Sequence, residues 1–394
     1  MVTPFQSYIE NKTNFQWSDE PEQFPLTALS EILLSPDNNT PPELLDTFFY
    51  VDEMSDDSYY DSLHQFTINE KIDLSKYDNL TTIDLAIIIW LNNPELLQRL
   101  HAGRYITKAR KFDTFFARTS GLPDTSNEAL AALENDLNDF FQLKRKGRGT
   151  RVFVFSQDDG LWFLIRHGSP IKRESTITDE GDSKGIIFRP EIYDVLNFLP
   201  DCGELQIHAS TIGEKKIYCN LIGTHIFGDG EFFIYSDNTE KFTLQPFCRD
   251  WRNSLICSDI DGIESVVPIE VRFVIDEELR HTATHKADNL FDAFEHAGHQ
   301  RLTFYNVNRL TLRIKFSGDQ SMRNVTLCTP CTAIFERDSD SSLINLFLKR
   351  RGFILNQIGE NHDIAIQQFA DSTGNERYSS TSIGVLATGH AERV

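Results

Sequence analysis

The chain has 394 residues, 40% hydrophobic and 25% charged, so it is long enough for two to three domains with buried cores. Its net charge of −21 disfavours long-range attraction to nucleic acid, and its longest apolar run, over residues 85–91, is far shorter than a bilayer span. Six cysteines and no leader-like N-terminal pattern indicate reduced thiols. We therefore expect a cytoplasmic protein that makes no membrane contact.

The first 60 residues are acidic, with twelve Asp or Glu against one Lys and thus a net charge of −11. Six prolines separate short apolar patches at 29–34 and 44–50. The aromatic side chains in this stretch need burial, which favours short helices packed on a body over full disorder. We predict an acidic, irregular, partly helical arm over residues 1–60.

Residues 67–103 show helical signals, because cap-type residues precede an apolar run and Pro94 suits the first turn of a further helix. That further helix should end near Gly103. The clearest helix is predicted over 128–143, where apolar residues recur at helical spacing before a cationic end and a glycine.

Strand patterns dominate after this helix. Apolar runs rich in Val, Ile, Phe and Trp, separated by Asp-Gly-type turns, are typical of antiparallel strands and hairpins. They predict strands over 151–156, 161–165, 192–199, 204–209, 232–235, 242–244, 265–275 and 302–316. Helical patterns are found at 214–221, 287–297 and 343–349.

The sequence thus predicts an α+β fold. It should have an acidic helical N-terminal region over 1–147, with the arm at its start, and an α+β domain over 148–355. That domain should hold a central, mostly antiparallel β-sheet with packed helices and a short helical C-terminal segment. A flexible tail is expected over 356–394, where the apolar spacing decays.

Residues 164–168 read Leu-Ile-Arg-His-Gly, an apolar strand that ends in Arg-His-Gly. The motif resembles the signature of the histidine-phosphatase superfamily. The resemblance implies that His167 attacks a phosphoryl group and that Arg166 clamps the phosphate. The polar, proline-containing stretch that follows departs from the strand-to-helix order of that superfamily. A structural histidine at a strand end is therefore the alternative.

A second pattern places acids on two consecutive strands and resembles the core of PD-(D/E)xK nucleases. Asp194 lies on the first strand, and Glu204 and Gln206 open the next, on one face because strand side chains alternate. The resemblance implies Mg²⁺ held by Asp194 and Glu204. Gln206 stands where those nucleases carry Lys, and acids beside a hairpin turn are also ordinary surface decoration.

Cys328 and Cys331 have the spacing of a metal knuckle or a redox pair. A structural zinc site needs two more ligands, which His281 and His285, or else His296 and His299, could supply. Two unrelated cysteines beside a strand are the alternative. The sequence requires no cofactor, and Zn²⁺ and Mg²⁺ depend on these two hypotheses.

A basic band follows the predicted helix 128–143 and consists of Lys144, Arg145, Lys146, Arg148 and Arg151. It could contact phosphates or an acidic partner despite the acidic total, or it could be a solvated helix end.

No complete catalytic set is found in the sequence. We therefore predict a non-catalytic interaction or regulatory subunit of a bacterial multi-protein system, with the acidic arm and the basic band contacting a protein partner or nucleic acid. The alternatives are a Mg²⁺-dependent PD-(D/E)xK-like nuclease that uses Asp194 and Glu204, and a phosphatase that uses Arg166–Gly168. The sequence leaves open whether the chain is an enzyme.

Overall fold

The computed structural model describes residues 3–13, 15, 24–37, 39–157, 160–177, 181–234, 240–297, 306–318, 322–337 and 340–355. The chain divides into two compact units, one that runs through Arg104 and one that begins at Tyr105. The boundary predicted near residue 147 differs, because the structure groups residues 105–147 with the second unit. The tail predicted over 356–394 lies outside the described residues.

The first unit is helical. Its helices are α1 (Gln6–Thr13), α2 (Leu26–Leu34), α3 (Pro42–Glu53), α4 (Tyr60–Asn69), α5 (Thr82–Asn92) and the first part of α6 (Pro94–Lys108), with 3₁₀ turns at Thr3–Phe5 and Asp57–Tyr59. A capping box between Thr81 and Asp84 begins α5, at the position that the cap-type residues indicate. Helix α6 continues past Gly103, because one interior glycine costs a helix only about 1 kcal/mol.

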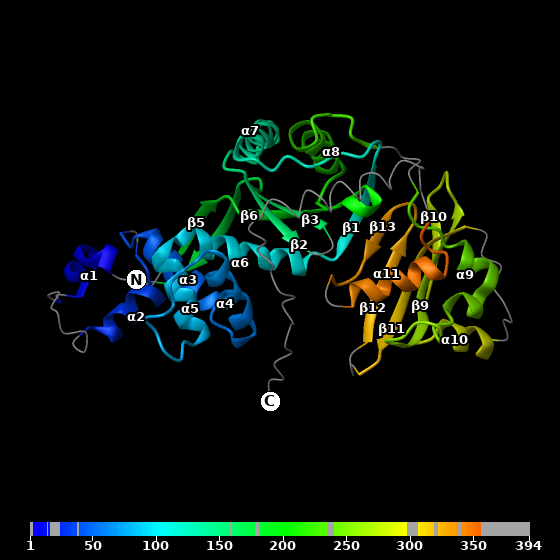
Figure 1. Ribbon diagram of the computed structural model, residues 1–394, viewed down its shortest axis with the longest axis horizontal. Coiled ribbons are helices and arrows are strands. Elements are labelled where there is room, and N and C mark those ends of the chain that lie inside the picture. Colours follow the sequence, from blue (N-terminus) through cyan, green and yellow to red (C-terminus); the bar gives the residue numbers. More distant parts are fainter. Residues whose placement is uncertain are drawn as a thin grey trace. The chain divides into compact units, whose positions relative to one another are not determined.

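The second unit is organised around one large sheet (Figure 1). Its strands are β1 (Lys111–Ala117), β2 (Arg151–Gln157), β3 (Gly160–Gly168), β6 (Glu191–Leu199), β7 (Glu204–His208), β8 (Phe233–Ile234), β9 (Ile263–Asp276), β10 (His281–Lys286), β11 (Val307–Phe316), β12 (Met322–Cys328) and β13 (Thr332–Ile334). They lie in the order β10-β9-β11-β12-β13-β1-β7-β6-β3-β2, with β8 beside β1. All pairings among these described strands are antiparallel.

Helices pack on this sheet. They are α7 (Asn127–Leu143), α8 (Ile212–Ile226), α9 (Gln245–Asp250), α10 (Leu290–His296) and α11 (Ser341–Arg350), with 3₁₀ turns at Pro200–Cys202 and Trp251–Leu255. Helix α7 confirms the clearest sequence prediction, since Leu133, Leu137 and Phe141 lie on one face, four residues apart, and are fully buried. The α+β class, with a mostly antiparallel sheet and packed helices, is confirmed.

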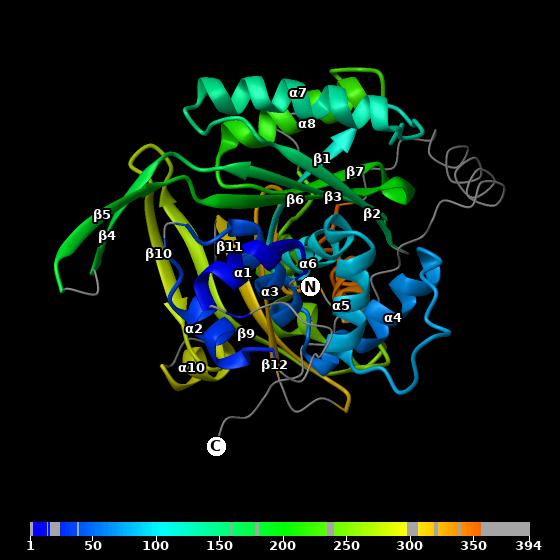
Figure 2. The ribbon, with the colours of Figure 1, turned by 90° about the vertical axis from the view of Figure 1, so that its left-hand side faces the viewer.

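The sheet buries its two hydrophobic cores on opposite faces. Helices α7 and α8 cover one face of the half that contains β2, β3, β6 and β7 (Figure 2). The second core lies on the half that contains β9, β11 and β12, and includes residues of α9, α10 and α11. Phe115 on β1 belongs to the first core, whereas Ala333 on β13, which pairs with Phe112, belongs to the second. Because strand side chains alternate, Phe112 and Phe115 point to opposite faces, and so do the two cores.

Strands β4 (Lys172–Ile177) and β5 (Ser183–Phe188) form a separate two-stranded hairpin that continues β3 and β6 beyond the large sheet (Figure 2). Pro170 and Pro190 lie between the two ladders, where their missing N–H groups interrupt strand pairing. Sequence reasoning placed no strand here, because a hairpin exposed on both faces has no apolar periodicity.

Strands β1, β10, β12 and β13 were likewise not predicted, and β10 is so exposed that it too shows no apolar alternation. The predicted strand 242–244 is instead a single bridge between Phe242 and Ile354. Among the described helices, none has both the length and the apolarity needed to cross a bilayer.

Candidate functional site

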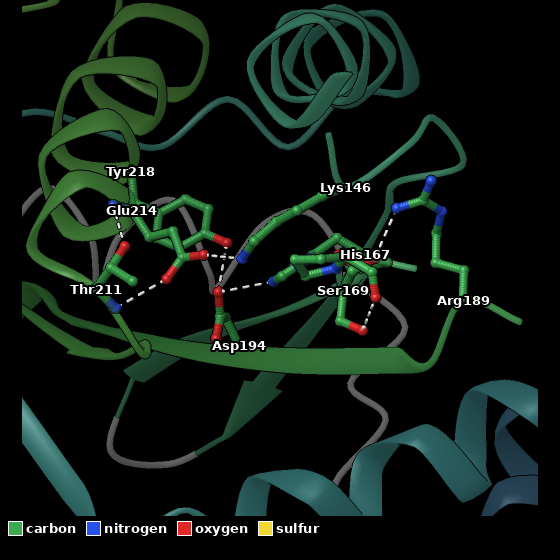
Figure 3. Close-up of polar contacts among 10 residues, drawn as sticks. Lys146, His167, Ser169, Arg189, Asp194, Thr211, Glu214 and Tyr218 are labelled. Atoms are coloured by element: carbon green, nitrogen blue, oxygen red, sulfur yellow. Dashed lines mark hydrogen bonds and ion pairs between the residues drawn. The ribbon is translucent and has the colours of Figure 1, made fainter. Parts of the chain in front are cut away.

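A buried polar cluster lies between the sheet and α8, at the end of β3 (Figure 3). His167 on β3 and Asp194 on β6 are diagonal neighbours, because His167 pairs with Ile192 and Ile165 pairs with Asp194. His167 Nε2 lies 3.0 Å from Asp194 Oδ2, and both residues are only 2% exposed. The structure thus brings together two residues that the sequence placed in two unrelated motifs.

Helix α8 adds two side chains to the cluster. Tyr218 donates its hydroxyl to Asp194 Oδ2 at 2.6 Å, and Glu214 lies one turn earlier on the same face. Burial and the neighbouring Asp194 carboxylate raise the pKa of the Tyr218 hydroxyl well above its ordinary value, so this group stays a proton donor. Glu214 also closes a capping box with Thr211, accepting from the Thr211 N–H at 2.8 Å.

Lys146 completes the cluster from the loop that follows α7. Its Nζ forms an ion pair with Glu214 Oε1, and its stem passes Phe141, with Nζ 5.5 Å from the ring centroid. The same Phe141 ring stacks on His167 at 4.0 Å between centroids. Burial by itself raises the pKa of the Glu214 carboxyl, but the hydrogen bonds from Lys146 and Thr211 and the charge of Lys146 outweigh burial and lower that pKa.

Hydrogen-bond chemistry constrains the protons in this cluster. His167 Nδ1 lies 2.9 Å from the Gly168 carbonyl oxygen, which can only accept, so Nδ1 carries a proton. Nε2 faces a carboxylate oxygen that already accepts from Tyr218. One further proton is therefore held between His167 and Asp194. That proton and the Lys146 ammonium contribute two positive charges, which balance the negative charges of the Asp194 and Glu214 carboxylates. Charges buried in a protein need to be balanced in this way.

The cluster borders the root of the β4–β5 hairpin. Arg189 donates from Nη1 to the Ser169 carbonyl at 2.6 Å and to the Arg145 carbonyl at 2.8 Å, which ties the hairpin root to the loop after α7. Gly168 is required at this point, since a Cβ there would lie 2.4 Å from the Lys146 carbonyl oxygen. The buried charges and the Arg189 contacts together fix where the hairpin leaves the sheet.

The same cluster is a candidate metal site. Ligand atoms of His167, Asp194 and Glu214 lie within 4.8 Å of one another, and the described residues contain no other group of three or more such ligands. Lys146 Nζ already neutralises Glu214, and Asp194 already accepts from His167 and Tyr218. A divalent cation would therefore have to displace Lys146.

The other residues of the phosphatase and nuclease hypotheses lie elsewhere. Arg166 alternates with His167 on β3 and so points to the opposite face of the sheet, where its Nε lies 3.9 Å from Glu191. Glu204 forms a buried ion pair with Lys241, and Gln206 Nε2 lies 3.5 Å from Glu204. Glu204 pairs with Leu199, five residues after Asp194, which places the two acids about 16 Å apart on opposite faces.

Cys328, Cys331, His281 and His285 do not meet as zinc ligands, and His299 of the alternative pair lies outside the described residues. Cys328 on β12 is three strands from His285 on β10, about 14 Å at ordinary strand spacing. His285 stacks on Phe273 at 5.6 Å between centroids, and His281 is exposed at the start of β10. Burial raises the pKa of both the Cys328 and the Cys331 thiols, which opposes thiolate formation.

The basic band makes several contacts within the second unit. Lys146 pairs with Glu214, Arg148 with Asp139 at 2.7 Å and Arg151 with Glu134 at 3.1 Å. Lys144 lies over the Phe140 ring. Arg145 adopts a left-handed conformation with φ of 59° and offers its carbonyl to Arg189. Part of this band thus holds the α7–β2 loop in place.

Sequence reasoning missed Glu214, Tyr218 and the role of Lys146. One signal was present: Thr211-x-x-Glu214 is a capping-box pattern, and Tyr218 follows Glu214 by one helical turn. No local pattern links Lys146 to them.

Neither the protein-family models nor the curated proteins that were searched give a match to this chain.

Proposed function

We propose that this chain is a non-catalytic interaction subunit that binds a partner protein through the β4–β5 hairpin. One observation carries the proposal: five large apolar side chains are exposed in the 18-residue stretch 171–188, which contains the hairpin. They are Ile171, Ile177, Ile186, Ile187 and Phe188, with exposed fractions of 62%, 83%, 46%, 70% and 42%. Concentrated apolar exposure of this kind marks interaction surfaces, whereas single exposed apolar residues are ordinary.

The hairpin itself calls for a partner. A two-stranded sheet is marginally stable in water unless it packs on something, and all twelve residues of β4 and β5 are exposed except Thr176, which is half-buried. Its apolar residues lie on both faces, with Ile186 and Phe188 on one face and Ile177 and Ile187 on the other. Among the described residues no strand pairs with either outer edge.

The polar cluster supports this function as an anchor. Its buried charges and the Arg189 contacts hold the hairpin root, and a rigid root lowers the conformational entropy that a partner must remove on binding. His167 and Asp194 are buried and fully engaged, which favours a structural role over a nucleophilic one. The proposal also keeps three expectations from the sequence. They are a cytoplasmic location, membership of a bacterial multi-protein system, and nucleic-acid contact through the basic band.

The test uses the full-length tagged chain in lysate of its native host. The Ile177→Ser, Ile186→Ser, Ile187→Ser triple variant should lose the protein that the wild type retains. Leu279→Ser is the matched control, because Leu279 is 78% exposed at a distance from the hairpin, and this variant should retain the partner. Retention of the same partner by the triple variant would rule out the hairpin as the binding surface.

The purified chain also separates this proposal from its alternatives. Divalent-metal-dependent cleavage of DNA or RNA that disappears in Asp194→Asn would favour the nuclease. Phosphoenzyme formation that disappears in His167→Ala would favour the phosphatase. Either result would contradict a non-catalytic role.

A further inference from the structure

We infer that the hairpin pairs with the hairpin of a second copy of this chain, edge to edge along β5, to give a four-stranded antiparallel sheet β4-β5-β5-β4. This inference rests on the proposed function and names the partner. It follows from which edge is apolar, from the register that this edge permits and from the charges that the register brings together.

The apolar edge is β5. This strand carries Ile186, Ile187 and Phe188 in succession and a single charge, Lys184. Strand β4 carries three charges in its first three residues, Lys172, Arg173 and Glu174, so its edge is already protected by charge. Main-chain groups on an open strand edge recruit another strand, and apolar side chains decide which edge is used.

A two-fold axis through Ile186 gives β5 a self-complementary register. Ile186 of one copy then lies opposite Ile186 of the other, and Phe188 lies opposite Lys184, a pairing of an aromatic ring with a cation. On the other face Ile187 lies opposite Gly185, the residue with no side chain. No two like charges are directly opposed along β5 in this register.

The Arg173 side chain reinforces this register. Within one hairpin Arg173 pairs with Ile187, and its guanidinium lies over Gly185, so close that a Cβ at Gly185 would be 2.6 Å from Nη2. The guanidinium therefore covers the glycine and would lie beside Ile187 of the second copy. Gly185 thus leaves room for two large side chains, one from each chain.

The symmetry and the size of this contact also set its strength. A two-fold pairing is the commonest way for a soluble chain to bind itself, because one surface serves both copies. Two six-residue strands and their side chains fall at the low end of interface sizes. We therefore expect a dimer that dissociates on dilution.

The first experiment tests the axis by cross-linking. In a Cys202→Ser background, which removes the exposed native thiol, Ile186→Cys should form a disulfide-linked dimer under mild oxidation, because directly opposed residues on antiparallel strands place their Cβ atoms within reach of a disulfide. Ile177→Cys is the matched control. It is more exposed but lies on the outer strand β4, and it should remain monomeric on denaturing gels. Equal cross-linking of both variants would overturn the register.

The second experiment tests the pairing by charge. Light scattering of the purified wild type should show a dimer at high concentration, whereas Ile186→Lys and Ile186→Glu should each be monomeric because like charges meet on the axis. Mixing these two variants should restore the dimer. A wild type that stays monomeric at every concentration would overturn the second copy as partner but leave the proposed function standing. In the reverse outcome, the dimer depends on the hairpin but the triple variant still retains a partner protein from lysate. That result would overturn only the proposed binding of this partner protein through the hairpin.

Discussion

At the scale of single residues, the buried cluster depends on a balance of charges. His167 and Asp194 share one proton, and Lys146 faces Glu214, so the removal of one member leaves another charge buried without its partner. A broken buried pair of this kind costs about 3–5 kcal/mol, far more than the loss of an exposed pair. The cluster should therefore be sensitive to single substitutions.

Glu214 gives the cluster a dependence on pH. Its pKa is lowered in the folded state, so its contribution to stability is complete above the ordinary glutamate pKa of about 4.3 and is lost as the pH falls through the lowered value. Glu214→Gln should reduce the free energy of unfolding by about 3 kcal/mol at pH 7, and by progressively less below pH about 4. Urea unfolding at several pH values measures this difference.

The control for this prediction is Asp139→Asn. Asp139 is paired with Arg148 on an exposed part of α7, and its loss should cost less than about 1 kcal/mol. A Glu214→Gln difference that stays constant down to pH 3 would show that the carboxylate contributes through something other than its charge.

At the scale of elements, the close packing at Gly168 fixes the hairpin to the sheet. Gly168→Ala should destabilise the chain by about 1–3 kcal/mol, because the new Cβ would collide with the Lys146 carbonyl and with the Arg189 stem. Gly213→Ala on α8 is the control, since a Cβ there meets no atom closer than 3.9 Å and alanine favours a helix. Urea midpoints compare the two variants, and equal midpoints would count against a tightly packed hairpin root.

The elements that sequence reasoning found are those with a recognisable apolar pattern. Helix α7 was predicted because Leu133 and Leu137 mark its apolar stripe, and β3 because residues 161–165 form a continuous apolar run, which the structure buries on both faces of the strand. The β4–β5 hairpin was missed because both of its faces are exposed, which leaves no periodicity to detect. His167 and Asp194 were each singled out by motif, but their contact depends on the register between β3 and β6 across the hairpin, and no local pattern contains that register.

At the scale of the whole molecule, charge opposes self-association. Each copy carries −21, so two copies repel at long range, while the proposed contact along β5 is mainly apolar. Raising the salt concentration from 0.05 to 0.5 M, chosen to shorten the Debye length from about 14 Å to about 4 Å, should increase the dimer fraction severalfold. Sedimentation velocity at fixed protein concentration measures it, and a dimer that weakens with salt would point to ionic contacts between the copies instead.

The position of the two cores on opposite faces of one sheet bears on how this unit comes apart. Only three residue pairs join β1 to β13, and Asp113 reinforces them by accepting from Thr332 and pairing with Lys215. Separation of β1 from β13 along this short seam, the β1–β13 pairing, would expose strand edges but leave each hydrophobic core covered by its own helices. The two halves are therefore expected to lose their structure in separate steps, and the seam is where a partly unfolded form would first offer strands to a neighbouring molecule.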